Sequence, residues 1–430
     1  MEIPAKGQSS MSIPAQRQNE VYLHELRLFL EEICCSLLRF RYAAEGGIEP
    51  QHVRINQEYS LGIPDAFADI RVEVTGAPPY FIEVKYGYSP AQTVAALTRK
   101  YGPGARLGEA SKIVVVGDAN LAASWRDIEP QIRSCLPHKL DIEIWDEKTL
   151  LSMLRASFGV EVNSISESEV LEMHSAVDRA QGRCAFEETW TNDGLQNSLV
   201  WHYGFWRLKQ LRQGHGLTPR MIVPPGMYPG VVTVMADLCG FSGYVKDTRK
   251  DEIIRHCLTT FYSKARYSIL NTGGMMYQFV GDQVIGLYGI PDHPEGYVES
   301  AFDCAKALVD IGNSVSHEWQ RQIDSVQKVR GVHIGICIGE MQVVSLRPFS
   351  RAHISGIGDV INLAARLLAH AGPSQIVASN TYYQALAPEY QAAFREAAPV
   401  EARNVGTIRA WQADLSDPAI RPASVRPLQA

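Results

Sequence analysis

The sequence lacks the features that mark secreted and membrane-spanning proteins. It has no uninterrupted run of about 18 apolar residues, the length that a membrane-spanning helix needs. Its opening segment, MEIPAKGQSSMSIPAQRQNE, is polar and has no apolar core of the kind found in a secretory signal. Eight cysteines are scattered, and no CxxC pair occurs, which argues against a zinc site and a disulfide framework. We therefore expect a cytoplasmic protein in a reducing environment, with no membrane partner.

Positive charge is also scarce. The formal net charge is −6, which argues against bulk electrostatic binding to nucleic acid or to an anionic membrane, although it leaves room for a local basic patch. The length of 430 residues predicts two or three domains, since roughly 100–200 residues per domain is usual. Hydrophobic residues make up 46% of the chain, which is enough to build an apolar core in each domain.

The N-terminal third predicts an α/β domain. Residues 1–19 have the composition of a flexible tail, and residues 20–160 follow the order α-β-β-α-β-α-β-α. From Glu20 to Phe40, leucine and isoleucine recur at helical spacing. The strands that follow are separated by proline and glycine turns.

Three ionisable residues stand out in this domain. Asp69 lies inside one strand, and Glu83 and Lys85 share one face of the next, because side chains repeat every two residues. Two carboxylates and a lysine on adjacent strands could hold a divalent metal and activate water for phosphodiester hydrolysis. With Pro64 and Asp65 nearby, the arrangement resembles the PD-(D/E)xK restriction-endonuclease-like superfamily. The alternatives are a polar strand face held by an ion pair, or an inactive member that serves as a sensor, for example of nucleic acid.

Residues 161–222 predict helices that link two domains. Aromatic and basic residues gather near their end: Trp201, Tyr203, Phe205, Trp206, Arg207, Lys209 and Arg212. A nucleic-acid stacking surface would use such a set. Packing against a neighbouring domain or a second subunit is the favoured alternative.

Residues 223–415 predict an α+β domain, with residues 416–430 as a second tail. Strands and helices follow the order βαββαββαβ, beginning with a strand at 231–236 and including a hairpin about Gly281 and Asp282. This order favours a ferredoxin-like sheet with helices on one face.

Polar residues stand at the strand ends of this domain. The apolar strand VVTVMAD ends on Asp237, and Asp282 lies at the hairpin tip. If these strands are neighbours, the two carboxylates meet and could hold two divalent ions. The residues after Asp237, with Gly240 and Phe241, supply backbone N–H groups at a helix start, which is an anion site.

A second polar pair lies on a later helix, VINLAARLLAHA. Asn362 and Arg366 are four residues apart, so they share one face. An amide that orients a sugar and a guanidinium that meets developing phosphate charge would suit phosphoryl transfer.

The motifs MADLCGFS, FVGDQVIGLYG and GIGDVINLAARL occur in this order, and the domain resembles a class III nucleotidyl cyclase catalytic domain. The resemblance implies that Asp237, Asp282 and the backbone carbonyl of Leu238 bind two Mg²⁺ or Mn²⁺ ions. It also implies that Phe241 and its neighbours contact the triphosphate through backbone amides. Arg403 stands near the place of a phosphate-binding lysine in that family.

The resemblance further implies a homodimer with composite sites. Metal ligands would come from one subunit, while Asn362 orients the ribose and Arg366 stabilises the transition state from the other.

The base-reading positions depart from the family. Adenylate cyclases usually carry Lys and Asp there, and guanylate cyclases Glu and Cys, whereas this chain has Gln278 and Ser355. A neutral pair could read uracil or cytosine, with Tyr277 or Ile357 filling space that a purine would occupy. This resembles the pyrimidine cyclases of the Pycsar antiphage system, which make cyclic UMP or cyclic CMP for a separate effector. UTP is favoured over CTP.

Three alternatives to a pyrimidine cyclase remain. The first is an adenylate cyclase with an unusual base pocket. The second is a nuclease that uses Asp69, Glu83 and Lys85, with the cyclase domain as a nucleotide sensor. The third is a pair of catalytically inactive regulatory domains.

Overall fold

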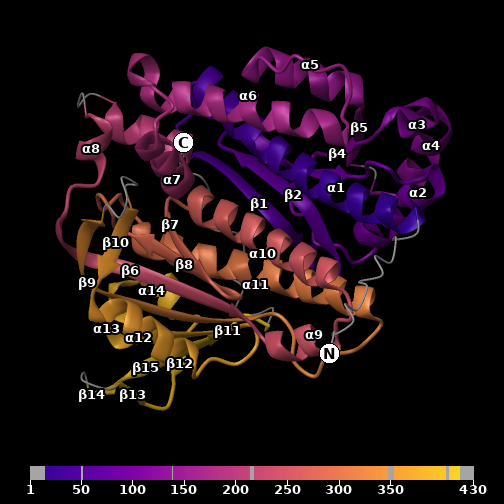
Figure 1. Ribbon diagram of the computed structural model, residues 1–430. Coiled ribbons are helices and arrows are strands. Elements are labelled where there is room, and N and C mark those ends of the chain that lie inside the picture. Colours follow the sequence, from indigo (N-terminus) through magenta and orange to yellow (C-terminus); the bar gives the residue numbers. More distant parts are fainter. Residues whose placement is uncertain are drawn as a thin grey trace, which may run out of the picture.

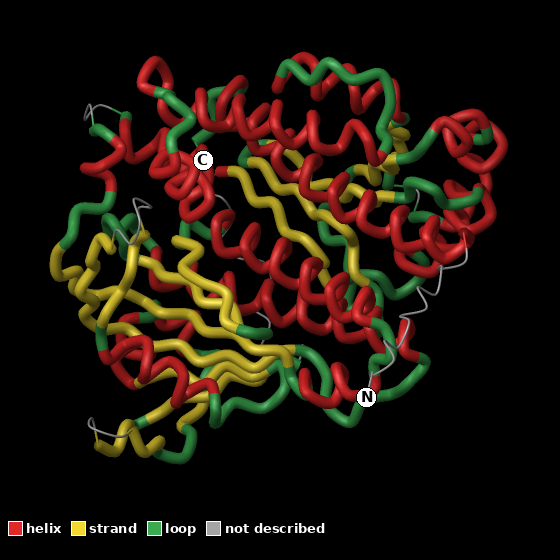
Figure 2. The backbone as a smooth tube through the Cα atoms, viewed as in Figure 1, coloured by secondary structure: helices red, strands yellow, loops and turns green. Residues whose placement is uncertain are grey.

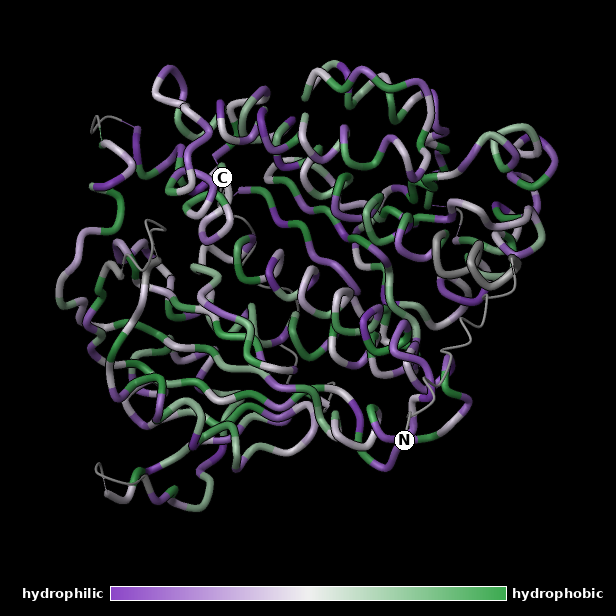
Figure 3. Tube along the Cα trace, viewed as in Figure 1, coloured by the Kyte–Doolittle hydropathy of each residue, from purple (hydrophilic) through white to green (hydrophobic). Residues whose placement is uncertain are grey.

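The computed structural model describes residues 15–49, 52–137, 139–213, 217–346, 353–402 and 406–416. Two large β-sheets and one two-stranded sheet are present in this described part of the chain, and helices cover both large sheets (Figures 1 and 2). The first sheet belongs to the N-terminal domain and the second to the C-terminal domain. Hydrophobic segments follow the strands of both sheets (Figure 3). Among the helices of the described ranges, none is both long and apolar enough to cross a bilayer.

The N-terminal domain contains five strands and five helices in the described part of the chain. Their bounds are α1 Ala15–Phe40, β1 Val53–Ser60, β2 Phe67–Val74, β3 Ala77–Val84, α2 Pro90–Tyr101, β4 Lys112–Val116, α3 Ala119–Ala123, α4 Trp125–Cys135, β5 Asp141–Trp145 and α5 Glu147–Phe158. The predicted tail over 1–19 is wrong in its last part, because α1 begins at Ala15; residues 1–14 lie outside the described residues. Three strands, not the two predicted, precede α2.

The first sheet has the order β1-β2-β3-β4-β5, and its two faces bury different helices. Strands β1, β2 and β3 are antiparallel, whereas β4 and β5 run parallel to β3. On one face Ile70 and Ile82 pack with α1 and α5. On the other, Phe81 packs with Leu97 of α2 and Ile128 of α4. Because side chains alternate along a strand, Glu83 and Lys85 share the α2 face with Phe81.

Helices α6 Glu167–Phe186, α7 Gly194–Arg212 and α8 Pro219–Ile222 connect the two sheets. Met173 of α6 belongs to the first domain's core, and Phe205 of α7 is fully buried in the second domain's core. Tyr203 and Trp206 are also buried, so these rings pack in the protein interior and do not form a stacking surface for nucleic acid.

The C-terminal domain is built on a second, larger sheet. Its elements are β6 Gly226–Leu238, α9 Phe241–Asp247, α10 Asp251–Asn271, β7 Met275–Val280, β8 Gln283–Tyr288, α11 Tyr297–Ile323, β9 Val332–Leu346, β10 His353–Ile357, α12 Asp359–Leu368, β11 Gln375–Ser379, α13 Asn380–Ala385, α14 Pro388–Gln391, β12 Arg395–Glu396, β13 Val400–Ala402, β14 Gly406–Ile408 and β15 Ala410–Asp414. In the described residues the strand order is β12-β15-β11-β9-β6-β8-β7, with β10 paired to β9. The residues predicted as two strands before α12 form the single long strand β9.

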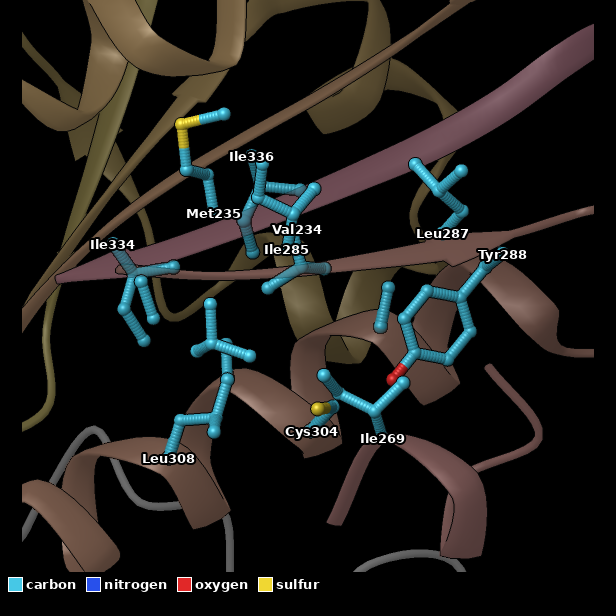
Figure 4. Close-up of a cluster of buried hydrophobic side chains, with 14 of the residues drawn as sticks. Val234, Met235, Ile269, Ile285, Leu287, Tyr288, Cys304, Leu308, Ile334 and Ile336 are labelled. Atoms are coloured by element: carbon cyan, nitrogen blue, oxygen red, sulfur yellow. The ribbon is translucent and has the colours of Figure 1, made fainter. Parts of the chain in front are cut away.

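Helices cover both faces of this sheet, so the prediction of helices on one face is wrong. Ile334 and Ile336 of β9 pack toward Ile269 of α10 and Leu308 of α11 (Figure 4). Gly335, between them, faces α12, where an added Cβ would lie 2.2 Å from the Ala364 carbonyl oxygen. The missing side chain therefore lets α12 approach the second face.

Helices α10 and α11 lie between the two sheets and contact both (Figure 1). Lys264 of α10 is 4% exposed. Its Nζ lies 2.7 Å from Glu31 of α1 and also pairs with Glu58 of β1. Ser314 of α11 donates a 2.6 Å hydrogen bond to Glu58. A buried ionic cluster thus joins the N-terminal domain to the helices that cover the second sheet.

Candidate active site

Asp237 is the last residue but one of β6. This strand lies between β8 and β9 in the sheet. Its neighbours across the sheet are Gln283 of β8 and His333 of β9. The preceding residues Val234, Met235 and Ala236 are buried, whereas the Asp237 side chain is 26% exposed. The strand therefore delivers a carboxylate from the core to the protein surface.

Asp282 lies in the two-residue turn between β7 and β8, close to Asp237. Burial, then the charge of Asp237, raises the pKa of Asp282 to about 6. Asp237 pairs across the sheet with Gln283, the residue after Asp282, so the fold brings the two acidic residues close together within one chain. Tyr262 of α10 donates a hydrogen bond to the Gly281 carbonyl and stacks on Phe279 at 4.2 Å, which supports the turn from the helix side.

His333 is a member of this site that the sequence reasoning missed. Its Nε2 lies 3.2 Å from Asp237 Oδ2, and its Nδ1 lies 3.1 Å from the Ala371 carbonyl oxygen. Burial opposes the charged imidazolium, but the hydrogen bond and charge of Asp237 outweigh it and raise the pKa of His333. Only the β6–β9 register, set by long-range pairing, reveals this contact.

The backbone turns sharply after Asp237. Gly240 has a φ of 73°, in the left-handed region that favours glycine, and α9 begins at Phe241. Cys239 is buried, and burial together with the charges of Asp237 and Asp282 raises the pKa of its thiol to about 12.

Asn362 and Arg366 lie on α12, which covers the same sheet face as Gly335. Both side chains are exposed. In the described ranges neither forms a hydrogen bond or ion pair through its side chain, and the structure does not join either to Asp237 or Asp282.

Gln278 and Ser355, the predicted base-reading residues, lie on neighbouring elements. Tyr277, which forms a β-bulge in β7 beside Gln278, places its hydroxyl 3.1 Å from the Gly356 nitrogen and 3.3 Å from its oxygen. This double contact ties β10, with Ser355 and the 59% exposed Ile357, to β7. Arg403 lies outside the described residues.

The donor set around Asp237 suits a hard divalent cation. Mg²⁺ typically binds one or two carboxylates and completes its shell with waters and substrate phosphates. In the described residues no group of three or more His, Cys, Asp or Glu side chains could hold a metal. The carboxylates of Asp237 and Asp282 would therefore be the protein ligands of Mg²⁺ or Mn²⁺ here, and waters or phosphates would complete the shell.

The structure also brings Asp69, Glu83 and Lys85 together in the N-terminal domain, with one addition. Lys85 Nζ lies 2.8 Å from Asp69 and 2.6 Å from Glu83. Lys100 of α2 bridges the same carboxylates at 2.6 and 2.8 Å. Tyr101 donates a 2.7 Å hydrogen bond to Glu83. Burial opposes ionisation of Asp69, but Lys100 and Lys85 outweigh it and lower its pKa.

This buried cluster carries two negative and two positive charges, and the Lys100 ammonium stands between the carboxylates where a metal ion would be needed. The arrangement favours the ion-pair alternative over a nuclease site.

Comparison with known proteins identifies the C-terminal domain. Residues 224–413 match the family model described as "Adenylate and Guanylate cyclase catalytic domain". The match confirms the class predicted from the three motifs: the chain carries a class III adenylate/guanylate cyclase catalytic domain, that is, the catalytic domain of a nucleotidyl cyclase, a lyase. No match to a curated protein was found.

Solved cyclases resemble the chain at low identity. The guanylyl cyclase Cya2 is 20% identical with a TM-score of 0.39, over 44% of this chain and 93% of that one. The adenylyl cyclase CyaB from P. aeruginosa is 18% identical with a TM-score of 0.40, over 48% and 100%. The guanylate cyclase domain of RhGC from Catenaria anguillulae, in complex with GTP, is 16% identical with a TM-score of 0.36, over 44% and 97%. These likenesses carry no substrate assignment to this chain.

The Asp282→Asn variant tests the carboxylate pair. Removing one charge relieves the repulsion with Asp237, so without divalent cations we expect a Tm equal to or above that of the wild type at pH 7.5. Adding Mn²⁺ with a non-hydrolysable triphosphate should raise the Tm of the wild type but not of the variant, because the amide carries no charge and has an NH2 group in place of one carboxylate oxygen. Thermal unfolding with EDTA or Mn²⁺ measures both. Asp127→Asn, an exposed carboxylate on α4, is the control. A variant that keeps the Mn²⁺-dependent rise would contradict the assignment.

The Lys100→Met variant tests the buried cluster of the N-terminal domain. Removing one ammonium leaves carboxylate charge buried without compensation, which should lower the free energy of unfolding by about 3–5 kcal/mol. The control is Lys112→Met, because Lys112 makes an exposed ion pair with Glu143 at 2.9 Å and should cost less than about 1 kcal/mol. Urea unfolding compares the two. Equal losses would show that Lys100 is no more than a surface cation.

Proposed function

We propose that the protein converts a nucleoside triphosphate to its 3′,5′-cyclic monophosphate and pyrophosphate. The observation that carries the proposal is the convergence of Asp237 and Asp282 inside a domain of the cyclase family. The 3′-hydroxyl releases its proton to water and its oxygen forms a bond to the α-phosphorus. The bond from that phosphorus to the bridging oxygen breaks, and pyrophosphate leaves. When bound, two Mg²⁺ or Mn²⁺ ions favour the 3′-alkoxide and neutralise triphosphate charge.

The chain's own groups divide the work between binding and charge stabilisation. Asp237, Asp282 and the Leu238 carbonyl are the cation donors. Backbone N–H groups at Phe241 contact the triphosphate. By its position relative to the family, Arg403 also binds a phosphate through its positively charged guanidinium.

The remaining groups come from a second subunit. Asn362 orients the ribose, and Arg366 places its guanidinium where negative charge develops on the phosphates. Their exposure in the single chain, and their lack of side-chain partners among the described residues, support a homodimer in which each site is completed by the partner subunit.

UTP is the proposed substrate, with CTP as the second choice. Gln278 and Ser355 each offer a hydrogen-bond donor and an acceptor and carry no charge. The two contacts between the Tyr277 hydroxyl and Gly356 tie together the strands that carry Gln278 and Ser355. The alternative substrate is ATP, which would make the enzyme an adenylate cyclase. A pyrimidine product suits a second messenger in bacterial antiphage defence that activates a separate effector.

The N-terminal domain then serves as a sensor and not as a nuclease. The observation that supports this choice is the placement of Lys100 between Asp69 and Glu83, which fills the cation position of the predicted second site.

A substrate panel with mixed variants tests the proposal. The wild type with Mn²⁺ and each of the four triphosphates should give cyclic UMP as the main product, resolved by chromatography. Asp237→Ala and Asn362→Ala should each lose more than about 99% of the activity, since each removes a transition-state interaction. Mixing the two variants should restore part of it, because one of the two sites in a mixed dimer keeps both residues.

Several results separate the candidates. Cyclic AMP alone would exclude the pyrimidine proposal, and no recovery on mixing would exclude composite sites. Glu83→Ala tests the second candidate site, in the N-terminal domain. If the wild type cleaves DNA or RNA and this variant does not, the nuclease alternative would be favoured.

The Tyr277→Phe variant tests how the base pocket is held. The hydroxyl's two contacts with Gly356 would be lost, so Ser355 would be held less firmly relative to Gln278. We expect the KM for the preferred triphosphate to rise by about tenfold and discrimination between UTP and ATP to fall, while stability changes by only about 1 kcal/mol. Tyr228→Phe is the control, because that hydroxyl binds the Pro224 carbonyl at 2.8 Å. Unchanged discrimination would refute the role of Tyr277.

A further inference from the structure

The loop over residues 324–331, between α11 and β9, packs against the turn from Asp237 to Gly240. The Cys239 N–H donates a 2.9 Å hydrogen bond to the Gly331 carbonyl. The Val329 carbonyl oxygen lies 3.3 Å from the position that a Cβ would take on Gly240. Gln327 donates a 2.7 Å hydrogen bond to Asp247 at the end of α9. The position of this loop therefore sets the path of the backbone that follows Asp237.

The N-terminal domain reaches this same loop through one side chain. Asp65 lies in the turn between β1 and β2. Its Oδ1 is 3.1 Å from Nη1 of Arg330, and its Oδ2 is 3.6 Å from Nδ1 of His317 on α11. Asp65 has a φ of 56°, a left-handed conformation that aspartate tolerates better than most residues. The turn is thus held in a conformation that presents the carboxylate to the other domain.

The docking of the two domains fixes where this turn lies. Glu58 is seven residues before Asp65 on the same hairpin, and it belongs to the buried cluster with Lys264 of α10 and Ser314 of α11. The hairpin therefore cannot slide along α11 without separating buried charges. Asp65 therefore contacts Arg330 from a hairpin whose position is fixed by this buried cluster.

We propose that Asp65 is a positioning residue for the cyclase reaction: by holding Arg330, the N-terminal domain fixes the 324–331 loop and with it the turn from Asp237 to Gly240. The proposal rests on the proposed function. Asp65 touches neither substrate nor cation, so its effect passes through the loop. The Asp65 side chain is 33% exposed and that of Arg330 51%, and exposed pairs contribute little to stability. Changes at this contact therefore should alter the turn without unfolding the protein.

Kinetics of single and paired substitutions test the proposal. Asp65→Asn and Arg330→Gln should each lower kcat/KM by up to about fivefold, mainly through kcat, with an unchanged Tm. The double variant Asp65→Asn/Arg330→Gln should lose little more than either single variant, so the double-mutant cycle should show coupling. Asp141→Asn is the matched control, because Asp141 and Arg133 form an exposed ion pair in the N-terminal domain at 2.7 Å.

Hydrogen exchange at the Cys239 amide gives a readout that does not depend on activity. Exchange should be faster in Asp65→Asn than in the wild type and unchanged in Asp141→Asn, because the acceptor on Gly331 is less firmly held. Unchanged exchange together with unchanged kcat/KM would overturn the positioning role. A wild type that forms no cyclic nucleotide would overturn the proposed function, and faster exchange in Asp65→Asn would then still support the contact.

Discussion

Two carboxylates held side by side repel each other, and the arrangement of the C-terminal sheet keeps them together. Strand β6 lies between β8 and β9, so Asp237 is flanked on one side by the hairpin that carries Asp282 and on the other by His333. Each neighbour acts on the charge of Asp237 in a different way. The hydrogen bond and charge of Asp237 raise the pKa of His333. Burial and the charge of Asp237 raise the pKa of Asp282 to about 6. A divalent cation would offset the charge of both carboxylates at once.

Much of this arrangement could be predicted from the sequence. An apolar strand that ends on an acid, and an acid at a hairpin tip, are local signals, and both Asp237 and Asp282 were found through them. Asn362 and Arg366 follow from helical spacing. His333, Tyr262 and Lys100 were missed because each meets the acids only through sheet register or through a helix that packs from elsewhere in the chain. The position of α12 on the second face also escaped prediction, since its determinant, Gly335, is a missing side chain inside a strand.

The two acidic clusters of the chain show how the same residue types reach different outcomes. Asp69 and Glu83 are buried with the ammonium groups of Lys85 and Lys100, so each charge is balanced inside the protein. Asp237 and Asp282 have no lysine or arginine partner among the described residues and remain partly open to solvent. Sequence spacing alone could not separate these cases, because Lys100 lies on a helix 15 residues beyond Lys85. The distinction between a closed ion-pair cluster and an open cation site rests on tertiary packing.

Helices α10 and α11 have a consequence for how the molecule comes apart. They form a layer that both sheets share, and Lys264 projects from it into the other domain. If the N-terminal domain alone unfolded, this lysine would lose both carboxylate partners, and the apolar contacts around Tyr267 would open to water. The free-energy cost of separating the domains is therefore added to that of unfolding either one, which favours a single cooperative transition for the whole chain. A chain that is two domains by sequence is in this sense one thermodynamic unit.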